Sequence, residues 1–300
     1  MSIKFLYDRQ KIAITYGEQK ISYADVIKYV NFYSDFLDIE KGDRSALMME
    51  NRPESIFSFF SIWAKKGIAI SLDAGYTVDQ LAYVLGDSEP KYLFVSNKTK
   101  EVAEAANSKL NNAIKIINVD ELQMPADYKI KQEEFSNDSN EDVAVLVYTS
   151  GTTGNPKGVM ITYENIETNM AGVRAVDLVN ENDVILAMLP YHHIMPLCFT
   201  LILPMYLGVP IVLLTEISSA SLLKTLQENR VTVIVGVPRV WEMLDKAIMT
   251  KINQSSVAKF MFKLASKTNS MSIRKMLFSK VHKQFGGHIR LMVSGGAKID

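Results

Sequence analysis

Apolar residues in the first half of the chain follow two patterns, short continuous runs and stripes with helical spacing. The runs have the length and the β-branched content of buried strands; they lie at residues 46–49, 68–72, 92–95 and 114–119. The stripes repeat every three or four positions, as in amphipathic helices; they lie at residues 23–37, 53–66, 77–85 and 99–110. Pro53 suits a first helical turn, and Gly67 is expected to end that helix. This alternation predicts an α/β fold with a doubly wound, mostly parallel sheet.

The second half repeats the alternation. Its apolar runs predict strands at residues 184–189, 209–214, 231–235 and 289–293. Helices are expected at residues 162–176, at 219–229 and around Trp241. Between the halves, residues 125–142 contain few apolar and many charged groups, which predicts a loop or an exposed linker. We therefore expect two α/β sheets, the second beginning after about residue 178.

One apolar segment, Leu197 to Leu214, approaches the length of a membrane-spanning helix. Pro204, Gly208 and Pro210 interrupt it, and it barely reaches the roughly 18 residues that a span requires. We interpret it as a buried helix, a turn and a buried strand.

Composition limits the classes of partner and the cellular compartment that fit this chain. The 33 basic and 33 acidic residues cancel, so the whole-chain charge gives no indication of nucleic-acid binding. The single cysteine, Cys198, cannot form an internal disulfide and lies between apolar neighbours, which favours a packed thiol in a reducing compartment. The N-terminus has no apolar signal segment. These features predict a cytoplasmic protein.

The most informative stretch runs from Val143 to Gly158 and reads VAVLVYTSGTTGNPKG. A strand-like run is followed by glycines that allow close backbone approach, by hydroxyl side chains and by one lysine. This combination suits a polyphosphate. It is not a Walker A loop, because Lys157 follows Pro156 and is not followed by Ser or Thr. The alternative interpretation is a Gly/Thr-rich hairpin that happens to carry a lysine.

The string from Tyr148 to Gly158 closely resembles the phosphate loop of the adenylate-forming superfamily, which includes acyl- and aryl-CoA ligases. The resemblance implies that ATP and a carboxylic acid form an acyl-adenylate, which then yields a CoA thioester. Its cofactors would be ATP, Mg²⁺ and CoA. Thr152 matches the Mg²⁺-coordinating threonine. The implied ATP-binding residues in this stretch are Thr149, Ser150, Gly151, Thr152, Thr153, Gly154 and Lys157, with Lys157 also acting in catalysis.

Two further segments match the superfamily. Pro190-Tyr191-His192-His193 resembles the motif whose second histidine lines the acyl and adenylate pocket, which makes His193 a catalytic and substrate-pocket residue. Adjacent histidines without nearby Cys, Asp or Glu lack zinc-ligand spacing. No acidic residue lies between Asp183 and Glu216, which argues against an amino-acid substrate.

The segment Gly295-Gly296-Ala297 follows the last predicted strand and resembles the part of the family that lies against adenine and the acyl chain. Gly295 would also border the substrate pocket. The resemblance implies one subdomain at residues 39–177 and another built from 1–38 and 178–300, with the first helix joining the second sheet. The family's later motifs and its small C-terminal domain would follow Asp300. We therefore expect an N-terminal portion of a ligase that has little or no activity alone.

The insert between Trp241 and Ile289 resembles the long-chain fatty-acid branch, so a long-chain acid is the expected substrate. An aryl- or medium-chain-CoA ligase remains an alternative, as does a non-catalytic module that binds nucleotide or acyl groups. A phosphate-loop kinase is disfavoured by the missing Gly-Lys-Ser/Thr.

Residues 246–299 contain no Asp or Glu but eleven Lys and Arg, so the rest of the chain has a net charge of −11. Lys259, Lys263 and Lys267 share one helical face beside Phe260 and Leu264. One interpretation is a solvated helical excursion whose apolar side packs on the second sheet. The other is a basic amphipathic surface at 246–290 that contacts an anionic membrane.

Overall fold

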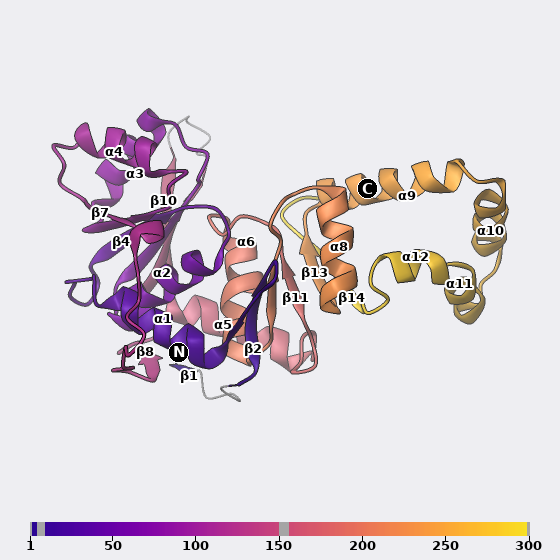
Figure 1. Cartoon of the computed structure of the whole chain (residues 1–300), viewed down its shortest axis with the longest axis horizontal. Helices are drawn as coiled ribbons and strands as arrows, with labels where there is room; N and C mark the ends of the chain where they lie inside the picture. Colours follow the sequence, from indigo (N-terminus) through magenta and orange to yellow (C-terminus); the bar gives the residue numbers. More distant parts are fainter. Residues whose placement is uncertain (1, 5–9, 150–155, 299–300) are drawn as a thin grey trace.

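The computed structural model describes residues 2–4, 10–149 and 156–298. Two six-stranded sheets form its body, and a group of helices projects from one end (Figure 1). The first sheet has the order β10-β9-β5-β4-β6-β7 and is parallel except at β10. Its strands are β4 Arg44–Met48, β5 Ile68–Leu72, β6 Tyr92–Val95, β7 Lys115–Asn118, β9 Val143–Thr149 and β10 Lys157–Thr162.

The second sheet has the order β14-β13-β11-β12-β2-β3 and is parallel except for the hairpin β2–β3. Its strands are β2 Ile12–Tyr16, β3 Gln19–Ser22, β11 Ile185–Ala187, β12 Ile211–Leu213, β13 Val233–Gly236 and β14 Leu291–Ser294. The predicted α/β fold with two mostly parallel sheets is confirmed.

Helices cover both faces of the first sheet and begin where the sequence supplies caps. Ser22, Thr77 and Thr162 each accept a hydrogen bond from the backbone N–H three residues later. The helices are α1 Tyr23–Ser34, α2 Pro53–Ala64, α3 Val78–Ser88, α4 Lys100–Ser108 and α5 Tyr163–Ala175. A 3₁₀ turn, Val119–Glu121, follows β7.

The apolar segment at 197–214 is divided as predicted. After the short helix α6 Ile194–Pro196 come a π-helical stretch Leu197–Ile202, α7 Leu203–Leu207 and then β12. Cys198 is buried there. Among the described residues, the helices are too short or too polar to cross a bilayer.

Three apolar cores hold the layers together. One core fills the space between the two sheets and includes α1, α2 and α5. A second lies under α3 and α4, and a third under α8 Ser219–Asn229 and α9 Pro238–Asn253. Continuity of the first core across both sheets fixes their relative position, and with it the site between their strand ends.

Two local expectations need correction. Lys66, with φ of 60°, takes the left-handed position at the end of α2, whereas Gly67 is required for space because a Cβ there would lie 2.7 Å from Ile39 Cδ1. The predicted linker at 125–142 contains a strand, β8 Glu134–Ser136, which pairs with β1 Ser2–Lys4. Phe135 is buried, and Tyr128 and Ile130 pack against the same core, so three apolar side chains anchor a largely polar segment.

The first helix contacts elements of both sheets, so its assignment to the second subdomain stays a prediction. The hairpin β2–β3 joins the second sheet, but α1 packs along α2, which belongs to the first sheet. Tyr29 stacks on Phe57 with ring centroids 4.6 Å apart, and Tyr33 meets the same ring edge-on. Tyr23 donates a hydrogen bond to the Val209 carbonyl, so α1 links the two sheets.

Residues 238–284 form the projecting group, which we call the arm (Figure 1). It consists of α9, α10 Ser256–Lys267, α11 Met271–Leu277 and α12 Ser279–Gln284. The interpretation in which the apolar side of this segment packs on the second sheet is wrong for α10. Phe260 and Val257 are each 69% exposed, because the helix lies at the outer end of the arm.

Candidate functional site

A cavity of about 660 Å³ lies where strands from both sheets end. The lining residues come from the segments that follow the carboxyl ends of β5, β9, β11, β13 and β14. They include Asp73, Tyr148, Thr149, His192, His193, Val237, Gly296 and Ala297. Open α/β sheets bind ligands outside the carboxyl ends of their strands. Here two sheets contribute such ends to one cavity, so this is the candidate site.

The cavity brings together four residues that the sequence predicts for the site, namely Thr149, His193, Gly296 and Ala297. Gly296 has φ of +80°, which few residues other than glycine adopt. A Cβ on Gly295 would lie 2.5 Å from the sulfur of Met195, which itself lines the cavity. The two glycines therefore allow the segment after β14 to turn and to lie against the cavity wall.

Five residues of the predicted phosphate loop lie outside the described residues, namely Ser150, Gly151, Thr152, Thr153 and Gly154. Their ATP contacts and the Mg²⁺ role of Thr152 therefore stay predictions.

Lys157 is exposed and begins β10, directly opposite Thr149 in the antiparallel ladder. The stretch is thus a hairpin, as the alternative interpretation had it, and one strand of this hairpin ends at the cavity through Thr149. The lysine begins the strand that leaves the loop, across the ladder from a residue that lines the cavity.

The two histidines have different surroundings. Their ring centroids are 4.1 Å apart, and His192 Nε2 lies 3.8 Å from Asp73 Oδ2. Burial lowers the pKa of His192; Asp73 opposes this shift and the adjacent His193 adds to it. Burial therefore favours the neutral form of His192. His193 is exposed, lines the cavity and directly precedes α6 as its N-cap, where its carbonyl accepts from the Leu197 N–H at 3.1 Å.

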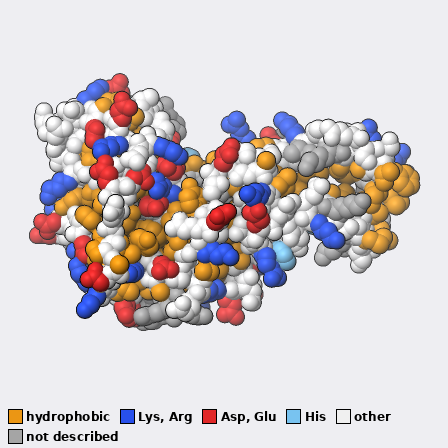
Figure 2. All heavy atoms as spheres, viewed as in Figure 1, with side chains coloured by type: hydrophobic (Ala, Val, Ile, Leu, Met, Phe, Trp, Pro, Cys, Tyr) orange, Lys and Arg blue, Asp and Glu red, His pale blue; other side chains and the backbone are white. Residues whose placement is uncertain are grey.

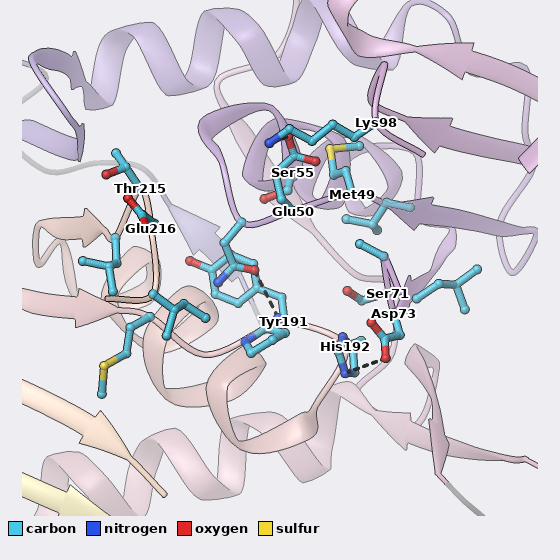
Figure 3. A pocket seen from close by; sticks show the side chains of 18 of the residues that line it. Met49, Glu50, Ser55, Ser71, Asp73, Lys98, Tyr191, His192, Thr215 and Glu216 are labelled. Carbon is cyan, nitrogen blue, oxygen red and sulfur yellow. Dashed lines mark hydrogen bonds and ion pairs between the residues drawn. The ribbon is translucent and has the colours of Figure 1, made fainter. Parts of the chain in front are cut away.

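A second cavity, of about 270 Å³, adjoins the first and shares Asp73, Pro190 and His192 with it (Figure 3). Its wall combines apolar side chains with polar ones, and the polar residues include Glu50, Ser55, Ser71, Lys98, Thr215 and Glu216. The Tyr191 hydroxyl is buried and has no hydrogen-bond partner within the described part of the chain. Burial raises the pKa of Tyr191, so the phenol stays protonated at any physiological pH.

Sequence reasoning missed two residues of this region. Asp73 lines both cavities, but it lies far from the two histidines along the sequence, so acidic residues close to them in sequence do not include it. Asp73 follows strand β5 directly, so the rule that sites form after strand ends could have found it. Asn51 donates from Nδ2 to the Leu189 carbonyl at 2.7 Å and accepts from the Tyr191 N–H at 3.3 Å. It holds the histidine segment from the first sheet.

Within residues 2–4, 10–149 and 156–298, no group of three or more His, Cys, Asp or Glu side chains is arranged to hold a metal ion. Mg²⁺ usually binds through one or two protein ligands together with substrate phosphates, so a single hydroxyl such as Thr152 is compatible with it.

One family model and several known proteins match this chain. The profile of the family described as AMP-binding enzyme matches residues 7–300. Fatty acyl-CoA synthetase A of Dictyostelium discoideum is 28% identical over 295 residues, which cover 88% of this chain and 44% of that protein. The 2-succinylbenzoate–CoA ligase of Bacillus velezensis is 31% identical over 68% of this chain and 40% of its own length. The chain thus spans less than half the length of these relatives.

Solved structures show the same fold. ATP-bound MatB from Rhodopseudomonas palustris superposes with a TM-score of 0.74 at 22% identity, covering 99% of this chain and 55% of that one. O-succinylbenzoate-CoA synthetase (MenE) from Bacillus subtilis in complex with AMP gives a TM-score of 0.71 at 21% identity, covering 99% and 53%.

Proposed function

The chain belongs to the AMP-binding enzyme family, and from that premise we propose that it is part of an ATP-dependent, AMP-forming acid–CoA ligase. In this reaction a carboxylate oxygen attacks the α-phosphorus of ATP, and pyrophosphate leaves. The CoA thiol then attacks the acyl carbon of the acyl-adenylate, and AMP leaves with the former carboxylate oxygen. One observation carries the proposal: Thr149, His193 and Gly296, predicted from three separate segments, line a single cavity.

Each segment has a distinct role in the proposal. The loop from Thr149 to Lys157 would bind the phosphates of ATP, with Thr152 contributing to Mg²⁺. The bound Mg²⁺ would neutralise phosphate charge. His193 would contact the carboxylate or the α-phosphate, and Gly295 to Ala297 would lie against adenine and acyl chain. Exclusion of water from the partly buried region around His192 would strengthen the electrostatic contacts to the substrates.

A long-chain fatty acid is the substrate we propose. Its support is the long insert at 242–288, which forms most of the arm, and the names of relatives. Besides the Dictyostelium synthetase, a long-chain-fatty-acid–CoA ligase of Bacillus subtilis is 25% identical over 269 residues. Other relatives act on smaller acids, so the acyl preference requires measurement.

The test is thioester formation by the full-length protein with a panel of acids. Palmitate is expected to give the highest kcat/KM, above octanoate, benzoate and acetate. A preference for benzoate or octanoate would replace the long-chain assignment with an aryl or medium-chain one. ATP binding without any thioester from the panel would favour a non-catalytic nucleotide-binding module.

The two histidines offer an internal comparison. We expect His193→Ala to lower kcat/KM of the full-length protein about tenfold or more, which is the worth of one hydrogen bond to a charged group. His192→Ala, which removes the neighbour paired with Asp73, is expected to have a smaller effect. Steady-state kinetics of both variants check this. A larger loss in His192→Ala would move the substrate contact to His192.

A further inference from the structure

The outer end of the arm exposes apolar side chains that nothing in the described chain covers. Figure 2 shows hydrophobic side chains gathered there, over α10 and α11. These residues are between 37% and 69% exposed; they are Val257, Phe260, Phe262, Leu264, Ile273 and Met276. Large contiguous apolar surfaces of this kind mark interaction sites in proteins.

The exposed residues of α10 are arranged in two parallel stripes. Val257, Phe260 and Leu264 are spaced i, i+3 and i+7, so they form one apolar stripe along the helix. Lys259, Lys263 and Lys267 are spaced i, i+4 and i+8 and form a second stripe beside it, also exposed. On the other side of the helix, Ala265 is buried.

The charge around these stripes has one sign. Residues 246–299 hold eleven Lys and Arg and no acidic residue, in a chain with no net charge. The acidic residues of the arm, Glu242 and Asp245, lie in the first half of α9, so the charged residues of the arm beyond them are all basic. An apolar stripe flanked by lysines in a positive field is the arrangement of helices that lie in a membrane interface, with lysines reaching headgroup phosphates.

We infer that the surface of α10 and α11 binds the face of an anionic lipid bilayer, with the Val257, Phe260 and Leu264 stripe in the headgroup boundary. A protein partner fits less well, because lysine is depleted at protein–protein interfaces, whereas here three lysines border the apolar stripe. Binding is interfacial and reversible. It is independent of the proposed ligase activity.

The experiment is co-sedimentation of the full-length protein with vesicles. One set contains phosphatidylcholine alone, and the other contains about one third phosphatidylglycerol. We expect binding to the anionic vesicles at about 0.05 M salt, at least tenfold less at about 0.5 M, and little to neutral vesicles. Changing Lys259, Lys263 and Lys267 together to Glu is expected to reduce anionic binding at least tenfold. Phe260→Ser is expected to reduce it several-fold.

Matched variants control for charge and for apolar exposure. The charge control changes three exposed lysines of the body together to Glu, namely Lys20, Lys98 and Lys129. This variant has the same net charge as the triple Glu variant of the arm, and its binding to anionic vesicles is expected to persist. Val176→Ser changes a residue that is 70% exposed outside the arm and should have no effect. Wild-type protein that fails to bind, or that binds neutral vesicles equally, overturns the inference. So does an oligomer in sedimentation velocity that Phe260→Ser dissociates, since the surface would then join two copies of this chain.

Discussion

Lys157→Ala is expected to lower carboxylate-dependent ATP–pyrophosphate exchange by the full-length protein about 100-fold or more. The expectation follows from removing a cation that acts on charge developing as pyrophosphate leaves, an interaction typically worth 10²–10³ in rate. Lys157 lies across the β9–β10 ladder from Thr149, which lines the cavity, and the Lys157 side chain is exposed. Its loss should therefore leave the fold intact.

The matched control is Lys20→Ala. Lys20 is also an exposed lysine on an antiparallel edge strand, β3, but on the far side of the second sheet from β14. Exchange should be unchanged in this variant, and circular dichroism of both should match the wild type. Normal exchange by a folded Lys157→Ala protein would remove the phosphate role from this stretch.

Arg290→Ala is expected to lower the free energy of unfolding by about 2–3 kcal/mol. The Asp183 carboxylate is 2% exposed; it receives hydrogen bonds from Arg290 Nε at 2.7 Å and from Thr232 Oγ1 at 2.7 Å. Removing one partner from a fully buried ion pair costs about 3–5 kcal/mol. The estimate is lower here because the Arg290 side chain is 41% exposed and water can replace it in part.

A matched control separates burial from the ion pair itself. Arg44 is also 41% exposed, but its partner Glu89 is 75% exposed at 3.4 Å. Arg44→Ala should therefore cost less than about 1 kcal/mol. Urea unfolding of both variants at pH 7 measures the difference. Equal losses would show that the burial of Asp183 adds nothing.

The pH dependence of this effect has a defined sign. Arg290 and the neighbouring hydrogen bonds hold the pKa of Asp183 below its ordinary value, against the opposing effect of burial, which is the largest single influence. A carboxyl with a lowered folded pKa stabilises the protein above its unfolded pKa, near 4, and this stabilisation is lost as pH falls. The deficit of Arg290→Ala should therefore shrink below about pH 4.

Hydrophobic patterning predicted most central strands and helices, because these bury continuous runs or one face. β6 and α8, for example, follow their predicted runs closely. One missed strand, β2, is internal and buried. Other missed strands are at edges: β8 has only one buried residue, and β10 is largely exposed. Such strands are specified by a partner across the ladder, which the sequence of one segment does not show.

The residues of the site also divide into those that the sequence predicted and those that only the fold reveals. Resemblance to superfamily motifs marked Thr149, His193 and Gly296, and each of them follows a predicted strand and lines the cavity. The contributions of Asp73 and Asn51 depend on how two sheets face each other, through contacts to residues more than a hundred positions away. In the arm, the pattern of α10 predicted an amphipathic helix, while only the fold shows that its apolar stripe is uncovered.

The central claim is that the cavity between the two sheets serves adenylate formation, and the most direct measurement is product analysis of a single turnover. The full-length protein is mixed with ATP, palmitate and CoA, and the nucleotides and thioester are quantified. The account predicts AMP, pyrophosphate and acyl-CoA in equal amounts, with no AMP when palmitate is omitted. Formation of ADP and phosphate, or AMP release that does not depend on a carboxylic acid, would contradict it.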